Sequence, residues 1–159
     1  MLYKRQTLSL LLALLFSLTL YANDINSTQT PSDQNLSFSE TYWKLVDMNE
    51  HLISPEPMKR EAHIIFSLLD EGKGKFKGAT GCNEMLGKYS GKENILNIDT
   101  KHIAMTRMAC PDMALETDFI RLLGETAFWK INAGYLSFKD SNGSVIMLLK
   151  AIEKAKNKK

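Results

Sequence analysis

Short runs in which apolar and polar residues alternate dominate the second half of this chain, and turn-forming residues separate these runs. Alternation with a period of two is typical of β-strands that bury one face. The pattern predicts strands over 42–46, 62–69, 75–80, 128–131, 135–138 and 145–149, with shorter strands over 88–90 and 95–98. A loop over 47–61, a turn over 70–74 and an Asn-Gly type turn over 140–143 are expected to connect them.

One segment has helical instead of alternating spacing. Pro111 and Asp112 are suited to the first turn of a helix, where a missing N–H and a negative charge are both tolerated. Gly124 is a suitable stop. Between them an apolar face recurs at helical spacing, made of Leu115, Phe119, Leu122 and Leu123. Short strands with one main helix predict an α+β domain, in which the helix packs on an antiparallel sheet.

The start of the chain has the pattern of a secretory signal peptide. Lys4 and Arg5 precede an apolar run over Leu8–Leu20, and Ala22 offers a small residue for cleavage. A retained membrane anchor is the alternative, although the run is shorter than the roughly 18–20 apolar residues that span a bilayer. Because no cysteine directly follows the run, no lipoprotein acylation site is expected. We therefore predict a periplasmic protein that keeps no transmembrane anchor after cleavage.

Four segments follow from these patterns. Residues 1–22 are the predicted signal peptide, 23–37 a flexible polar linker, 38–150 the folded domain and 151–159 a basic tail. The basic tail is expected to be solvated, with a weak contact to anionic surfaces as the alternative. The length of 159 residues and the 44% hydrophobic content fit one globular domain.

Charge adds little to this picture. The chain has 20 basic and 18 acidic residues, and loss of Lys4 and Arg5 with the signal peptide would make the two numbers equal. A formally neutral chain is not expected to be steered towards nucleic acid or acidic lipid. We expect a monomer that binds no nucleic acid and needs no cofactor.

Two sequence blocks carry the most specific signal. Residues 81–89 read Gly-Cys-Asn-Glu-Met-Leu-Gly-Lys-Tyr, and residues 106–110 read Thr-Arg-Met-Ala-Cys. Together with a Trp-x-Leu strand at 43–45, they make the chain resemble the META domain, or HslJ-like, family from about Trp43 to Leu149. The motif positions are Gly81, Cys82, Asn83, Gly87, Tyr89, Thr106, Arg107, Met108 and Cys110.

This resemblance implies a small antiparallel half-barrel, similar to pilot proteins that bind secretin tails or lipid. It implies an exported envelope protein with a role in stress tolerance, and an unknown envelope protein or lipid as its partner. No enzymatic activity defines the family, so no catalytic residue is carried over. Candidates to line a binding groove are Trp43, Phe66, Trp129 and Tyr135, with simple core packing as the alternative for each.

Cys82 and Cys110 allow three interpretations. Two cysteines of an exported chain usually pair, so a structural disulfide is the first. A redox-active pair is the second, although the Cys-x-x-Cys spacing that would support it is absent. The third is a soft-metal site for Cu(I), in which His102 and Met108 join Cys110.

The sequence offers three candidate glycosylation sites and no catalytic motif. Asn26, Asn35 and Asn142 each begin an Asn-x-Ser/Thr acceptor pattern, and each has an aspartate two residues earlier. These aspartates indicate the extended acidic acceptor of bacterial oligosaccharyltransferases, with chance matches in Asn/Ser-rich loops as the alternative. The sequence contains no Gly-x-Ser-x-Gly, His-Glu-x-x-His or phosphate-binding loop motif, and we predict a protein that is not an enzyme.

Overall fold

The structure is a computed structural model that describes residues 36–54, 60–110 and 113–152. Its elements in chain order are β1 (Tyr42–Met48), β2 (His51–Leu52), β3 (His63–Asp70), β4 (Lys73–Ala79), β5 (Glu84–Ser90), β6 (Asn97–Ile98), the 3-10 helix η2 (Thr100–His102), β7 (Ala104–Met105), α2 (Ala114–Glu125), β8 (Phe128–Asn132), β9 (Tyr135–Lys139) and β10 (Val145–Ile152).

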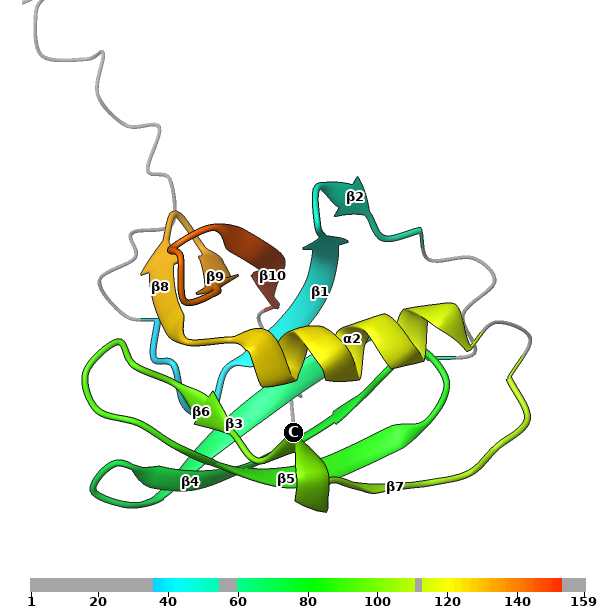
Figure 1. Cartoon of the computed structure of the whole chain (residues 1–159), viewed down its shortest axis with the longest axis horizontal. Coiled ribbons are helices and arrows are strands. Elements are labelled where there is room, and N and C mark those ends of the chain that lie inside the picture. The colour runs from blue at the N-terminus through cyan, green and yellow to red at the C-terminus, as the bar shows by residue number, and fades with distance from the viewer. Residues whose placement is uncertain (1–35, 55–59, 111–112, 153–159) are drawn as a thin grey trace, which may run out of the picture. The chain divides into compact units, whose positions relative to one another are not determined.

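Over the described residues the strands form one antiparallel sheet in the order β6-β5-β4-β3-β1-β10-β9-β8. The short β2 extends β1, and β7 pairs with β5. Figure 1 shows α2 lying across this curved sheet, between the side formed by β4–β7 and the side formed by β8–β10. The predicted α+β domain, with one main helix on an antiparallel sheet, is confirmed.

The two ends of the sheet meet at a seam. The amide of Leu96, just before β6, donates to the carbonyl of Ala127 at 2.9 Å. The amide of Trp129 in β8 donates to the carbonyl of Asn94, also at 2.9 Å. These two backbone hydrogen bonds connect the segment just before β6 to the start of β8. The sheet therefore curves into a half-barrel, and its concave face encloses the core.

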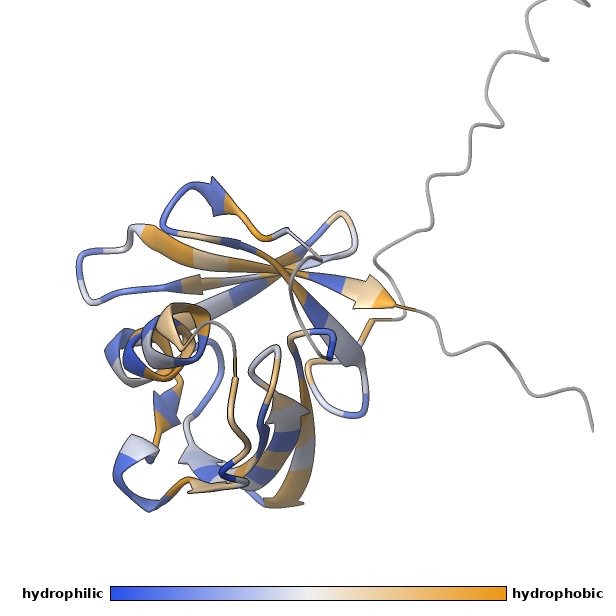
Figure 2. Cartoon of the chain, turned by 90° about the vertical axis from the view of Figure 1, so that its right-hand side faces the viewer, coloured by the Kyte–Doolittle hydropathy of each residue, from blue (hydrophilic) through white to orange (hydrophobic). Residues whose placement is uncertain are grey.

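The core lies between the concave face and α2. Phe119, Leu122 and Leu123 are the buried residues of α2, as the helical spacing predicts. Along the strands, hydrophobic and hydrophilic residues alternate as visible bands (Figure 2). Phe66 is fully buried, with its ring centroid 4.3 Å from that of Phe38 and 5.3 Å from that of Tyr89. The largest fully buried side chains include Trp43, Phe66, Phe76, Phe119 and Phe138.

Two inward-facing glycines make room for aromatic rings on the neighbouring strand. Gly74 of β4 stands opposite Tyr89 of β5, and a Cβ atom at Gly74 would lie 2.4 Å from the tyrosine ring. Gly87 of β5 stands opposite Phe76 of β4, and a Cβ atom there would lie 2.4 Å from the phenylalanine ring. Each aromatic ring therefore packs directly over a glycine, in the space that the side chain of any other residue would fill.

The structure departs from the predicted elements in several places. β5 begins at Glu84 instead of at 88, because its inward positions include Gly87, which hides the alternation. The described helix begins at Ala114, while Pro111 and Asp112 lie outside the described residues. η2 and the two-residue β7 were not predicted, because elements so short carry no periodicity. β2 likewise lies within the predicted 47–61 loop.

Replacement of Gly74 by alanine tests the packing of Tyr89. We expect Gly74→Ala to lower the free energy of unfolding by roughly 1–3 kcal/mol, because the added methyl overpacks against the ring and against the backbone carbonyl of Ser67. Urea unfolding followed by circular dichroism measures this change. Ser90→Ala, at an exposed position of β5, is the control and should stay within about 0.5 kcal/mol of the wild type. Equal stability of Gly74→Ala and wild type would contradict the proposed packing.

Candidate functional site

The two motif blocks are joined covalently. Cys82 and Cys110 form a disulfide with their Cα atoms 6.1 Å apart. It connects the turn between β4 and β5 to the segment that precedes α2. Cys82 is buried and Cys110 is partly buried, so the bond lies at the margin of the core. Both cysteines are consumed by this bond, and the structure holds no free thiol among the described residues.

The side chain of Asn83 joins the same two blocks through hydrogen bonds. Its Oδ1 accepts from the Thr106 hydroxyl at 2.9 Å and from the Met108 amide at 2.8 Å. Its Nδ2 donates to Glu116 Oε2 at 2.9 Å and lies 3.5 Å from Cys110 Sγ. This set uses both acceptor and both donor positions of the amide. Asn83 is only 2% exposed, so these contacts replace the water that the amide has lost.

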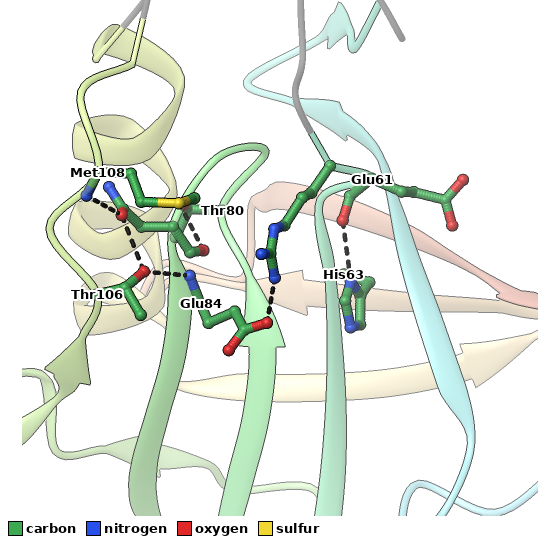
Figure 3. Close-up of polar contacts among 8 residues, drawn as sticks. Glu61, His63, Thr80, Glu84, Thr106 and Met108 are labelled. Atoms are coloured by element: carbon green, nitrogen blue, oxygen red, sulfur yellow. Dashed lines mark hydrogen bonds and ion pairs between the residues drawn. The ribbon is translucent and has the colours of Figure 1, made fainter.

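Thr80 and Thr106 extend this network to the helix and to β5. The buried Thr80 hydroxyl donates to Glu116 Oε2 at 2.6 Å. The Thr106 hydroxyl accepts from the Glu84 amide at 3.0 Å, as Figure 3 shows. Glu116 lies in the first turn of α2, where the helix dipole favours a negative charge. We name Thr80, Asn83, Thr106 and Glu116 the motif network.

The remaining motif positions have different roles. Gly81 has a φ of +99°, a left-handed conformation that glycine adopts without strain. Gly87 and Tyr89 belong to the packing of the inner face, and Arg107 is exposed. Sequence reasoning singled out neither Thr80 nor Glu116 as a site residue. The acidic residue in the first helical turn was the signal that could have identified Glu116.

A cleft of about 500 Å³ lies on the outer face beside the motif network. Its lining includes Arg60, His63, Lys77, Glu84, Leu86 and Met105. Arg60 forms an ion pair with Glu84 across one side of this cleft. In Figure 3, His63 lies beside this pair, and its Nδ1 donates to the Glu61 carbonyl at 2.9 Å.

Tyr42 flanks this cleft behind His63. The two rings stack with centroids 4.3 Å apart. Burial, together with the charge and hydrogen bonding of Glu61, raises the pKa of Tyr42 to about 12. The phenol therefore stays protonated at physiological pH, and it serves as a stacking partner and hydrogen-bond donor on this surface.

A second hollow, the mouth groove, opens next to the seam of the half-barrel. It has a volume of about 280 Å³, and its apolar lining consists of Phe38, Leu68, Tyr89, Ile95, Leu96 and Trp129. The rest of the lining is polar or glycine and includes Glu71, Lys92 and Glu93. Leu68 is 62% exposed and Ile95 is 53% exposed. The Tyr89 hydroxyl is buried and has no hydrogen-bond partner among the described residues.

The structure places the four predicted groove residues in different environments. Trp43 and Phe66 are fully buried in the core, so neither reaches an open surface. Trp129 is partly exposed and lines the mouth groove. Tyr135 is also partly exposed, and it lies on β9 opposite Asn132 and Lys150.

The proposed soft-metal set is not assembled as ligands. Cys110 Sγ is bound to Cys82 Sγ, so it presents no thiolate to a Cu(I) ion. His102 Nδ1 instead lies 2.9 Å from the carboxylate of Asp99. Over the part of the chain that the structure describes, no group of three or more His, Cys, Asp or Glu residues is placed to hold a metal ion.

Of the three predicted acceptor asparagines, Asn142 lies within the described residues. It is exposed in the turn between β9 and β10, where its amide donates to Asp140 Oδ1 at 2.9 Å. Asn26 and Asn35 lie outside the described residues, as do the predicted signal peptide and nearly all of the basic tail. Glycosylation at the three asparagines stays a prediction.

The fold and the motif network define a class: a small antiparallel α+β half-barrel around one helix, with two sequence blocks joined by a disulfide and a buried amide. The model of the META domain family matches residues 34–153, and the chain belongs to this family. The family is not known for enzymatic activity, and membership points to an envelope-associated protein.

A solved structure supports the same fold. The NMR structure of a protein from Burkholderia xenovorans is similar, with a TM-score of 0.55 and 18% sequence identity. The similarity covers 78% of this chain and 97% of that one. No curated protein matches the chain. Among the described residues, no helix has the length and apolar character needed to span a membrane.

Replacement of Asn83 by aspartate tests the motif network. We expect Asn83→Asp to lower the free energy of unfolding at pH 7 by roughly 3 kcal/mol, because a second carboxylate then faces Glu116. This like-charge contact raises the pKa of the pair in the folded variant. The loss should therefore shrink as the pH falls from 7 to about 4. Urea unfolding at both pH values measures it, with Thr80→Ser as the control that keeps its hydroxyl. A variant as stable as wild type at pH 7 would show that the amide is dispensable.

Removal of the disulfide tests the covalent link. The bond closes a loop with a sequence separation of 28, which corresponds to about 3–4 kcal/mol of chain entropy. We expect Cys82→Ala/Cys110→Ala to lower the free energy of unfolding, measured in urea, by up to this amount. Wild type reduced with dithiothreitol should give the same midpoint as the double variant. If both match the oxidised wild type instead, the bond does not stabilise the domain.

Proposed function

We propose that this META-domain protein is an exported, non-enzymatic binding protein that holds an extended apolar segment of an envelope protein in the mouth groove. The observation that carries this proposal is the exposure of Leu68 and Ile95 beside the partly buried Trp129. Large apolar side chains gathered at one hollow on a surface are typical of interaction sites. Isolated exposed residues, such as Leu52, carry no such implication.

The dimensions of the groove favour one apolar side chain as its occupant. Its volume of about 280 Å³ lies at the lower end of small-ligand sites, which measure roughly 300–1,000 Å³. Phe38 and Trp129 supply aromatic walls, with their ring centroids 4.5 Å apart. An aromatic or large aliphatic side chain of a partner that inserts between such walls is a common source of binding energy.

The Tyr89 hydroxyl supports a peptide as the occupant. A buried donor without a partner costs roughly 1–3 kcal/mol, and donation to a ligand carbonyl would recover this energy once the side chains that cover the hydroxyl move aside. A backbone carbonyl beside the anchor side chain is a neutral acceptor, which suits apolar surroundings better than a charged one. Two further features support export: the signal-like N-terminal pattern and the disulfide. Envelope stress tolerance is the cellular role that the family resemblance implies.

The neutral fluorescent probe N-phenyl-1-naphthylamine tests the groove. We expect its fluorescence to rise with the chain that begins at Asn23, which keeps every described residue. Leu68→Ser/Ile95→Ser should weaken this binding roughly tenfold, through the loss of apolar contact area. Leu52→Ser/Val145→Ser removes two exposed apolar side chains that do not line the groove and should bind as wild type does. Equal binding by both double variants would contradict the assignment.

Displacement of the probe identifies the class of occupant. We expect an acetylated and amidated peptide, Gly-Ser-Phe-Leu-Ser-Gly, to displace it, and the same peptide with alanine in place of both apolar residues to fail. Tyr89→Phe should weaken binding of the peptide. Binding of the probe should stay the same, because the probe lacks a carbonyl group. If dodecanol displaces the probe and the peptide does not, the occupant of the mouth groove is a lipid and not a protein segment.

A further inference from the structure

The outer face of β4 and β5 carries a group of lysines. Along β4, residues 74, 76 and 78 are buried, so Lys73, Lys75 and Lys77 face outwards and are exposed. Lys88 of β5 is also exposed and stands directly opposite Lys75 in the strand register. We name these four lysines the basic face. Successive outward residues of one strand lie about 7 Å apart, so the four ammonium groups share a small area.

The positive charge of the basic face is only partly compensated by neighbouring carboxylates. None of the four lysines forms an ion pair with another described residue. Of the nearby carboxylates, Glu84 pairs with Arg60, and Asp99 contacts His102 but also lies beside Lys88, because its amide donates to the Lys88 carbonyl at 3.0 Å. Asp70 stands opposite Lys73 at the end of the β3–β4 hairpin, so the four lysines outnumber the carboxylates that offset them. The neutrality of the predicted exported chain therefore hides a local excess of positive charge.

The Lys75–Lys88 pair is unfavourable for the fold itself. Like charges directly opposite each other destabilise an antiparallel strand pair. A polar uncharged residue at either position would fill the same exposed space without this repulsion. A bound anion would remove the repulsion too, so the pair is more easily explained by a ligand than by stability.

An exposed leucine lies among these lysines. Leu86 stands directly opposite Lys77 on the same outer face and is 53% exposed. Cations around an apolar side chain match the interface of a membrane, where phosphates contact the ammonium groups and the leucine enters the acyl boundary. A soluble polyanion would match the lysines and leave Leu86 without a role.

From this arrangement we propose that the basic face binds the surface of membranes that contain anionic phospholipid. Lys75, Lys77 and Lys88 contact the phosphate groups, and Leu86 inserts between the headgroups. The site is separate from the mouth groove and does not depend on what that groove binds. The folded domain itself then holds the protein at a membrane surface.

Co-sedimentation with vesicles tests this proposal on the chain that begins at Asn23. Wild type should bind vesicles of 30% phosphatidylglycerol in phosphatidylcholine, and the binding should be lost between 0.05 and 0.5 M NaCl because salt screens the attraction. Lys75→Gln/Lys88→Gln should bind about 30-fold more weakly, since each lysine near an anionic surface contributes about 1 kcal/mol. This variant should unfold at the same temperature as wild type or at a higher one, because it removes the like-charge pair.

Lys130→Gln/Lys150→Gln is the matched control. It removes two exposed lysines from β8 and β10, changes the net charge equally and leaves the basic tail in place. The control should bind the vesicles as wild type does, and Leu86→Ser should bind more weakly than wild type.

Three outcomes would overturn the assignment. An equal loss in the control variant would show attraction by net charge alone. If wild type does not bind the anionic vesicles at 0.05 M NaCl, or binds pure phosphatidylcholine equally well, the anionic membrane is not the ligand. If the protein binds soluble dextran sulfate but no vesicles, and Leu86→Ser leaves that binding unchanged, the ligand is a soluble polyanion instead.

Discussion

The side-chain amide of Asn83 is the interaction on which the rest of this structure depends. It belongs to the β4–β5 turn, and it bonds to the segment after β7 and to the start of α2. Because a buried amide must satisfy every donor and acceptor, it accepts only one arrangement of these segments. The disulfide fixes the same arrangement covalently, so the two motif blocks constrain each other in two independent ways.

The position of the helix follows from this junction. Glu116 receives hydrogen bonds from Thr80 and Asn83, which fixes the first turn of α2 against the β4–β5 turn. Phe119 and the two buried leucines then meet the concave face of the sheet. The inward positions of β4 and β5 are taken by glycines, aromatic rings and Met85, so the lysines between them are directed outwards. The alternation of inward and outward residues along these two strands thus produces both the packing of the core and the charge of the outer face.

Much of the fold could be predicted from local patterns, but the site could not. The apolar runs of β3 and β10 and the spacing of Leu122 and Leu123 are local signals, and the corresponding elements form. The partnership of Thr80 with Glu116 spans 36 positions and leaves no trace in either local pattern. The same holds for Lys75 and Lys88, whose opposition is a matter of strand register. Trp43 and Phe66 show a further limit, because aromatic residue type does not distinguish a groove from a core.

The order of the strands has a consequence for when this protein can fold. β1, the first strand along the chain, lies in the middle of the sheet, and its partner β10 is the last strand, with Tyr42 opposite Ile152. Trp43 and Leu45 therefore remain partly uncovered until the final strand has been made and has paired. If the chain is exported as proposed, threading through a channel from its N-terminus leaves this sheet incomplete until β10 has emerged. Strand order would then delay folding until translocation has ended, in a compartment where the two cysteines can be oxidised.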